Sequence, residues 1–236
     1  MFSKTAQYYD LIYYGKDYRA EVNQLLDLIR EHGPASGNRL LDIACGTGHH
    51  IQYLKEHFTV EGLDINPDLL GIARQRNPEI TFQEGDMINF DLGRKFDLIT
   101  CLFSSIGYVK TQDSLNKTID TMANHLETGG LLLVEPWFTP EEWKPDTVHA
   151  LFIDEPELKI ARVNTSFAEG HLSYFDLHYL IGTPKKTDHF VEHHELGLFE
   201  KGEMEAAFSD ADLQVTLDEQ GLIGRGMYIG MKPNPS

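Results

Sequence analysis

The sequence predicts an α/β protein with a doubly wound, mostly parallel, seven-stranded sheet and an antiparallel β insertion. Three observations support this fold class. Short apolar runs alternate with segments of helical periodicity over the first 135 residues. Several of these runs are apolar almost throughout, which is typical of strands covered on both faces of a parallel sheet. Beyond about residue 140, helical periodicity gives way to long β-like runs.

The first half of the chain places helices and strands in alternation. A helix is predicted over 17–32, because its apolar residues recur at spacings of three and four. Asn66-Pro67 begins a later helix, with asparagine as N-cap and proline at the first helical position. Gly129-Gly130 is expected to end the last helix of this half. The strands are predicted at 39–44, 60–64, 79–83, 96–102 and 131–135.

The second half predicts a β meander, followed by a return to the main sheet. The meander strands are expected at 148–153, 158–167, 171–181 and 188–199. A helix over 201–208 and strands over 213–218 and 226–231 then complete the sheet. The chain therefore divides into a core with an N-terminal segment over 1–139, an antiparallel insertion over 140–199 and a C-terminal completion of the core sheet over 200–236.

The composition indicates an ordered globular protein with an acidic surface. The 236 residues include 37 Asp and Glu against 20 Lys and Arg, a net charge of −17. Such a surface repels phosphate backbones and anionic lipid, so neither nucleic acid nor a membrane is an expected partner. The chain has no apolar stretch of signal-peptide or membrane-spanning type. With only Cys45 and Cys101, a reducing compartment and hence a cytoplasmic location are expected.

A glycine-rich turn stands where the first buried strand is expected to lead into a helix. The segment from Leu41 to Gly48 reads Leu-Asp-Ile-Ala-Cys-Gly-Thr-Gly. Small residues there let the backbone approach a ligand, and the helix N-terminus offers free N–H donors. Asp64 ends the second strand, where its carboxylate can accept hydrogen bonds from both hydroxyls of a ribose. With Gly85-Asp86-Met87 after the third strand, the pattern predicts a ribose-containing cofactor.

Two classes of cofactor fit such a turn, and phosphate content separates them. A dinucleotide favours a G-x-G-x-x-G turn, against which its pyrophosphate lies. Here the stretch is Ala44-Cys45-Gly46-Thr47-Gly48-His49-His50, which lacks the first and last glycine. Pyrophosphate binding is therefore poorly supported, and a nicotinamide-dependent oxidoreductase is the less favoured alternative.

The turn resembles the first motif of class I S-adenosylmethionine (SAM) methyltransferases, whose acid-x-G-x-G core serves an adenosine without phosphates. Ala44 replaces the usual first glycine, and its side chain is small enough to leave the approach open. The resemblance implies a Rossmann-like fold and SAM as the cofactor. It also implies that Asp64 binds the ribose, Ile65 packs on adenine, and Asp86 and Met87 contact the adenine edge. The cofactor-binding residues expected on this basis are Tyr9, Tyr18, Asp42, Ala44, Gly46, Gly48, Asp64, Ile65, Asp86, Met87 and Leu102.

Six further segments, in order along the chain, resemble N,N-dimethyltransferases of nucleotide-linked (dTDP) amino sugars in antibiotic biosynthesis. They are Tyr9-Asp10-Leu11-Ile12, Gly15-Lys16-Asp17-Tyr18, Leu92-Gly93-Arg94-Lys95-Phe96, Phe103-Ser104-Ser105-Ile106-Gly107-Tyr108, Val134-Glu135-Pro136-Trp137 and Gly224-Arg225-Gly226. This resemblance implies that Tyr9 and Tyr18 form a lid over SAM and that the segment ending at Tyr108 faces the amine. Some relatives have histidine where this chain has Tyr108.

The chemistry of methyl transfer suggests roles for several residues. The reaction is an in-line displacement, so positioning and exclusion of water matter more than strong acid catalysis. The amine must be unprotonated to attack, so a group that accepts its proton would help. Tyr108 and Ser105 are the candidate catalytic residues that orient the nitrogen, and Glu135 is a further candidate at the fifth strand end. Arg225 suits bidentate contact with a diphosphate, and Trp137 can pack against sugar or base.

Simpler interpretations stay open for some of these residues. Arg225 also fits a salt bridge on an acidic surface. A histidine-rich run near the end of the insertion suggests a metal site, but alternation along a strand spreads its side chains over both faces. We therefore expect a solvated sheet face and no metal there. The run contains His189, Glu192, His193, His194 and Glu195.

The expected partner is a small molecule, a nucleotide sugar, and a second copy of the chain is a further candidate for a homodimer. Two functional alternatives remain besides the oxidoreductase. One is a SAM-dependent methyltransferase for another small-molecule amine or hydroxyl. The other is a non-catalytic SAM-binding protein.

Overall fold

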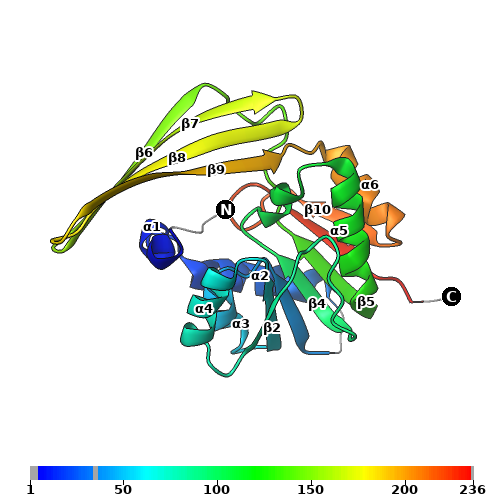
Figure 1. Ribbon diagram of the computed structural model, residues 1–236. Helices are drawn as coiled ribbons and strands as arrows, with labels where there is room; N and C mark the ends of the chain where they lie inside the picture. The colour runs from blue at the N-terminus through cyan, green and yellow to red at the C-terminus, as the bar shows by residue number, and fades with distance from the viewer. Residues whose placement is uncertain (1–4, 34–36, 235–236) are drawn as a thin grey trace.

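The computed structural model describes residues 5–33 and 37–234 and contains two separate sheets (Figure 1). The main sheet has seven strands in the order β10-β11-β5-β4-β1-β2-β3. Neighbours from β3 to β5 pair in parallel, whereas β11 is antiparallel to both β5 and β10. The predicted fold class is confirmed. The strands are β1 (Arg39–Ile43), β2 (Thr59–Asp64), β3 (Thr81–Glu84), β4 (Phe96–Cys101), β5 (Leu126–Val134), β10 (Gln214–Asp218) and β11 (Met227–Met231).

Helices cover both faces of the main sheet, which explains why its central strands are apolar. One buried cluster joins α2, α3 and α4 to one face, and another joins α5 and α6 to the other. Within the described residues, no helix is long and apolar enough to cross a membrane. The helices are α2 (Tyr18–His32), α3 (His49–Leu54), α4 (Pro67–Arg76), α5 (Gln112–Asn124) and α6 (Lys201–Asp210).

Local sequence sets where these helices begin. Asn66 caps α4, since its side-chain oxygen accepts hydrogen bonds from the N–H groups of Asp68 (2.9 Å) and Leu69 (3.3 Å). Pro67 takes the first helical position, as predicted. Asp17 caps α2 in the same way by accepting from Ala20 N–H at 3.0 Å. The N-termini of α2 and α4 are therefore fixed by side chains nearby in sequence.

One predicted boundary is wrong. Gly129-Gly130 does not end a helix, because α5 stops at Asn124 and β5 already begins at Leu126. The two glycines instead lie within β5, where the pairing register with β4 shifts. Gly129 has a φ of +79°, and a Cβ on Gly130 would come within 2.8 Å of the Asp97 carbonyl oxygen. The glycines thus permit an irregularity in a strand, which the sequence pattern does not separate from a helix end.

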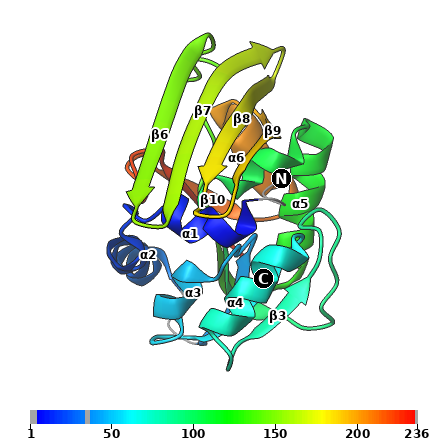
Figure 2. The same cartoon turned by 60° about the vertical axis from the view of Figure 1, so that its left-hand side comes forward.

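The second sheet is an antiparallel meander in the order β6-β7-β8-β9. It packs against the turn η2 (Ser105–Val109) through β9, so it covers the region beyond the carboxyl end of β4. The short helix α1 (Tyr9–Ile12) lies between this small sheet and the α2–α4 layer (Figure 2). The strands are β6 (Thr147–Glu155), β7 (Leu158–Glu169), β8 (Leu172–Gly182) and β9 (Thr187–Gly197).

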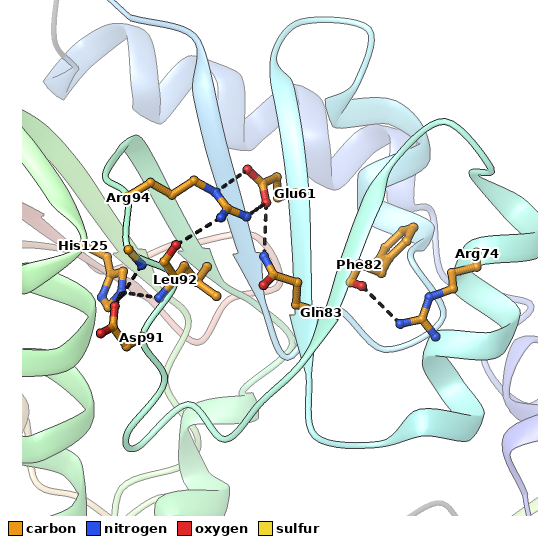
Figure 3. Close-up of polar contacts among 9 residues, drawn as sticks. Glu61, Arg74, Phe82, Gln83, Asp91, Leu92, Arg94 and His125 are labelled. Carbon is orange, nitrogen blue, oxygen red and sulfur yellow. Dashed lines mark hydrogen bonds and ion pairs between the residues drawn. The ribbon is translucent and has the colours of Figure 1, made fainter.

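The segment between β3 and β4 is tied to the main sheet by polar contacts (Figure 3). Arg94 donates to both carboxylate oxygens of Glu61 on β2. The N–H of Leu92 donates to Nε2 of His125 at 3.1 Å, while Nδ1 of His125 lies 2.8 Å from the Thr121 carbonyl oxygen. Nδ1 must therefore carry the proton, and both ring nitrogens are satisfied. His125 thus fixes the segment that begins with the Gly-Asp-Met step.

Candidate active site

The turn after β1 brings backbone close to the space beyond the sheet. Ala44, Gly46 and Gly48 have φ angles of +56°, +54° and +73°, all left-handed. Glycine adopts this conformation at little cost, whereas an alanine there costs about 1–2 kcal/mol. Ala44 and Gly46 line a cavity. Gly48 instead packs against α4, where a Cβ would come 3.2 Å from that of Ala73.

Asp42 lies on β1 beneath the turn and is almost wholly buried. Its Oδ1 accepts a hydrogen bond of 2.8 Å from Thr100 Oγ1 on β4. Burial raises the pKa of Asp42 to about 6, although His50 and Thr100 act in the opposite direction. Because a nearby positive charge favours the ionised form, this carboxylate suits a cationic part of a ligand.

Asp64 ends β2 and connects the glycine turn to α4. One carboxylate oxygen accepts from Gly46 N–H and the other from Asn66 N–H, both at 2.8 Å. Burial raises the pKa of Asp64, and these N–H donors partly offset the effect. The next side chain, Ile65, is 48% exposed although apolar. The exposed side chain of Ile65 therefore provides an apolar surface next to the Asp64 carboxylate, whose position is fixed by backbone hydrogen bonds.

A cavity of about 150 Å³ lies over these residues at the carboxyl ends of the parallel strands. Among the described residues, its lining includes Asp64 and Asp86 but no lysine or arginine. Such a lining suits a ligand that is cationic or neutral and lacks phosphates. The residues therefore fit SAM, a sulfonium-bearing adenosine, better than a dinucleotide.

A smaller cavity of about 40 Å³ continues from it toward Tyr18, Asp42 and Leu102. Tyr18 is stacked on the ring of His49 there, with 4.4 Å between ring centres. Together the two cavities are lined by every cofactor-binding residue that the sequence predicts, except Gly48.

The N-terminal segment is held over the glycine turn by Asp10. Its carboxylate accepts from Thr47 Oγ1 at 2.8 Å, lies 3.0 Å from His49 Nε2 and pairs with Arg76. Burial acts to raise the pKa of Asp10, but the contacts with His49, Thr47 and Arg76 outweigh it and lower the pKa to about 2. Tyr9, next in sequence, lines the cofactor cavity. The predicted lid therefore has a specific polar anchor, which we call the Asp10 latch.

A larger cavity of about 570 Å³ lies between the main domain and the inner face of the small sheet. Its walls are strongly aromatic. Trp137 lines it, with ring-centre distances of 5.6 Å to Trp143 and 6.2 Å to Phe175. The indole N–H of Trp137 donates to Ser173 Oγ at 3.0 Å, which fixes the ring. Flat aromatic surfaces of this kind suit a nucleobase or the face of a sugar ring.

Arg225 enters this cavity from the segment between β10 and β11. Its guanidinium carbon lies 4.9 Å and 4.5 Å from the ring centres of Trp137 and Phe138. It donates to Ser104 Oγ at 2.9 Å. No carboxylate in the part of the chain that the structure describes forms an ion pair with it, and burial lowers its pKa. The alternative interpretation, a surface salt bridge, is therefore not found among the described residues. The Arg225 guanidinium keeps N–H donors for an anionic ligand.

Tyr9, Ser105 and Tyr108 line both the cofactor cavity and the larger cavity. Ser105 and Tyr108 belong to η2, which directly follows the Phe103-Ser104 turn after β4. The two predicted catalytic residues therefore lie at the junction of the two cavities.

Glu135 does not line either cavity. It is 1% exposed, and its Oε2 accepts from Phe103 N–H at 2.6 Å. Oε1 has no hydrogen-bond partner among the described residues, and burial raises the pKa of the carboxyl group. Phe103 and Ser104 both have positive φ angles. Glu135 thus supports the strained turn beneath the site, whereas the sequence suggests direct contact with substrate.

The prediction of a solvated sheet face for the histidine-rich run is wrong for two of its residues. Glu192 and His194 are buried at 5% and 2% exposure, because they lie on the same face of β9 as Leu196, which lines the larger cavity. His189 and His193 point the other way and are exposed. No metal-binding group of His, Cys, Asp or Glu occurs among the described residues.

Most of the residues that the small sheet contributes to the larger cavity could not be identified from the sequence pattern. Arg162, Asn164 and Phe175 line it from β7 and β8, and Tyr13 does so directly after α1. The alternating pattern of the meander strands predicts two faces, but only the packing shows which face meets the core. Burial of His194 had one available signal, its place two residues before Leu196 on the same face of the strand.

A doubly wound sheet with a phosphate-free cofactor cavity at its carboxyl edge, joined to a second cavity under an added sheet, defines a SAM-dependent methyltransferase. A family model described as a methyltransferase domain matches residues 40–130. These residues span β1 to β5 and include the glycine turn, Asp64 and η2.

Relatives and solved structures agree over nearly the whole chain. It is 42% identical to dTDP-3-amino-3,4,6-trideoxy-alpha-D-glucopyranose N,N-dimethyltransferase of Streptomyces venezuelae, covering 96% of this chain and 97% of that one. It is 40% identical to dTDP-3-amino-3,6-dideoxy-alpha-D-glucopyranose N,N-dimethyltransferase of Streptomyces fradiae, covering 96% and 90%. The crystal structure of Streptomyces venezuelae DesVI matches with a TM-score of 0.90 at 40% identity, covering 98% and 99%.

SAM-bound CalS10, an amino pentose methyltransferase of Micromonospora echinaspora involved in calicheamicin biosynthesis, matches with a TM-score of 0.83 at 34% identity, covering 92% of each chain. The chain belongs to this family, the SAM-dependent N,N-dimethyltransferases of dTDP-linked amino sugars. The resemblance stated from the motifs is confirmed, and the oxidoreductase alternative is set aside.

Proposed function

We propose that the protein transfers methyl groups from SAM to the amino group of a dTDP-linked deoxy amino sugar. The observation that carries the proposal is the meeting of two cavities of different chemistry at Tyr9, Ser105 and Tyr108. One is acidic and suits a sulfonium cofactor. The other is aromatic, contains Arg225 and is large enough for a sugar and a base.

The cofactor supplies an electrophilic methyl group when bound, and the chain's residues position it. Asp64 would accept from the ribose hydroxyls, Ile65 would pack on adenine, and Asp86 and Met87 would contact the adenine edge. Asp42 and Tyr18 hold the far end of the cofactor, and Tyr9 closes over it. This assignment is supported by the cavity linings, which bring these side chains to one continuous space.

The acceptor lies in the larger cavity. Trp137 packs on sugar or base, and Arg225 contacts the diphosphate with two parallel N–H donors. Ser105 and Tyr108 orient the nitrogen toward the methyl group and keep its lone pair in line with the breaking bond. Glu135 acts from beneath, by holding the turn that carries Ser105.

Titration calorimetry with SAM tests the cofactor site. We expect Asp64→Ala to weaken SAM binding by about 100-fold, since hydrogen bonds to a charged group contribute about 1.5–3 kcal/mol. The matched control is Glu84→Gln, because Glu84 pairs with Asp64 across β2 and β3 but lies outside the cavity. Thermal unfolding confirms that each variant folds. Equal affinity of Asp64→Ala and wild type would contradict the assignment.

Two further proposals concern the setting of the enzyme. We place it in the cytoplasm, which fits two free thiols, Cys45 and Cys101. We also propose a homodimer through the outer face of the small sheet, where several large apolar side chains are exposed, a pattern typical of an interface. Light scattering measures that state directly. These side chains are Val148, Phe152, Val163, Phe167 and Leu180.

A further inference from the structure

The amine must lose a proton before each attack, and a buried hydrogen-bonded pair lies beside the site where this happens. Tyr108 lines both cavities, and its hydroxyl oxygen is 2.8 Å from Nδ1 of His194 on β9. The inference drawn from this pair rests on the proposed function, since it concerns the fate of the acceptor's proton.

The imidazole of His194 is held in one orientation. It is 2% exposed and stacks on Phe175 with ring centres 5.2 Å apart and an interplanar angle of 2°. Its Nε2 lies 4.0 Å from an oxygen of the buried Glu192. Glu192 in turn accepts from the backbone N–H of Thr5 at 3.2 Å and from its hydroxyl at 2.7 Å. The imidazole is therefore hydrogen-bonded to Tyr108 at Nδ1, and the Glu192 carboxylate is the nearby acidic group on its Nε2 side.

This order of groups decides where the imidazole proton resides. A carboxylate beside Nε2 favours the tautomer with its proton on that nitrogen. Nδ1 is then an acceptor, so Tyr108 donates its O–H to Nδ1. The remaining lone pairs of the Tyr108 oxygen are free to face an N–H of the acceptor amine.

We propose that His194 receives the proton of the acceptor amine through Tyr108. The N–H bond of the ammonium breaks as an O–H bond forms at Tyr108, and the original O–H bond of Tyr108 breaks as an N–H bond forms at Nδ1. The products are a neutral amine, a neutral phenol and an imidazolium beside the Glu192 carboxylate. The same step serves a second methylation after the imidazolium returns its proton to water.

Other charged and titratable groups face this layer from each packed element. Arg162 comes from β7 and Tyr179 from β8, Tyr13 directly follows α1, and Asp64 acts from the main sheet. Arg162 is a cation, whereas Glu192 and Asp64 carry carboxyl groups. The small sheet therefore supplies charged groups to this layer, as the core does.

The tautomer can be measured without any acceptor. ¹⁵N NMR of enzyme labelled on histidine, with SAM bound, should show one histidine with Nε2 protonated and Nδ1 hydrogen-bonded. His194→Gln should remove that signal, and Tyr108→Phe should shift its Nδ1 resonance. A proton on Nδ1 would overturn the proposal, because Nδ1 would then donate to Tyr108. This readout stands even if dTDP-amino sugars prove not to be substrates.

Kinetics with a dTDP-amino sugar supplies the second test. We expect His194→Gln to lower kcat by about 100-fold near neutral pH and to recover as pH rises and free amine becomes abundant. KM for the acceptor and the Kd for SAM should stay unchanged. Tyr108→Phe should show the same loss, and the double variant no further loss, because the two residues act in one relay. The control is His193→Gln, an exposed neighbour on the opposite face.

Three results would overturn the relay. The first is wild-type kcat in His194→Gln at all pH values. The second is a loss of the same size at every pH, which indicates a packing role for His194. The third is a double variant whose loss equals the product of the single losses. SAM titration of each variant separates these results from misfolding.

Discussion

At the residue scale, two carboxylates of the cofactor site are buried at a cost to the folded state. Asp42 and Asp64 both have raised pKa values because burial disfavours their charged forms. Asp64 is compensated by two backbone N–H donors, whereas Asp42 has one hydroxyl donor. Function at this site therefore opposes stability, and the opposition is measurable at Asp42.

We expect Asp42→Asn to stabilise the cofactor-free enzyme at pH 8 and to weaken SAM binding. The folded-state pKa of Asp42, about 6, lies above its ordinary value of 3.8. The ionised group therefore destabilises the fold above about pH 6, and the effect vanishes below about pH 4. Linkage between protonation and folding predicts that Asp42→Asn raises the free energy of unfolding by about 1–3 kcal/mol at pH 8. Urea unfolding at pH 8 and pH 4 measures it. A variant less stable than wild type at pH 8 would contradict this account.

Arg225 tests the acceptor cavity at the same scale. We expect Arg225→Lys to raise KM for the nucleotide sugar by about 10–100-fold, with little change in kcat or SAM affinity. Lysine keeps the positive charge but loses the bidentate pair of N–H donors and the stacking on the two aromatic rings. Steady-state kinetics provides the measurement. Arg30→Lys on the exposed face of α2 is the control. An unchanged KM would remove Arg225 from the substrate site.

At the element scale, the Asp10 latch holds α1 against the glycine turn, over the cofactor cavity. Asp10→Asn should destabilise the enzyme by about 1 kcal/mol at pH 7, after allowance for its partial exposure. Its folded-state pKa of about 2 lies below the ordinary 3.8, so its stabilisation is present above about pH 4 and is lost as pH falls toward 2. Urea unfolding between pH 7 and pH 3 should show the difference from wild type shrinking.

The control for the latch is Asp27→Asn, whose carboxylate forms an exposed pair with Arg30 on α2. That variant should change stability by less than about 0.5 kcal/mol. A latch variant that matches the control at every pH would show that α1 is held by its tyrosines alone.

The elements themselves were largely predictable from the sequence. Apolar periodicity located the parallel strands and their helices, and Asn66-Pro67 fixed the start of α4. The limit appears at Gly129-Gly130, where the same dipeptide that ends a helix instead permits an irregular strand. A glycine pair reports backbone freedom, and only the neighbouring strand decides its use.

At the whole-molecule scale, the cofactor half of the site was predictable because its residues follow strand ends in order. Asp42, Asp64 and Asp86 meet at one edge of any such parallel sheet. The acceptor half was not, because it arises where a separately paired sheet packs onto the core. Arg162 reaches the cavity, and His194 reaches Tyr108, only through that packing, and strand alternation alone does not determine which way these side chains face.

The architecture thus joins an acidic cofactor cavity to an aromatic cavity lined by Arg162 and Arg225. This junction explains how a protein with a net charge of −17 can accept an anionic nucleotide sugar, since Arg225 provides local positive charge inside an acidic molecule.

The most direct test of the account is mass spectrometry of the enzyme incubated with SAM and a panel of dTDP-linked deoxy amino sugars. We expect methyl groups to be added to the sugar nitrogen of at least one member, with one S-adenosylhomocysteine formed for each methyl group transferred. Binding of SAM with no methylated product from any member of the panel would contradict it.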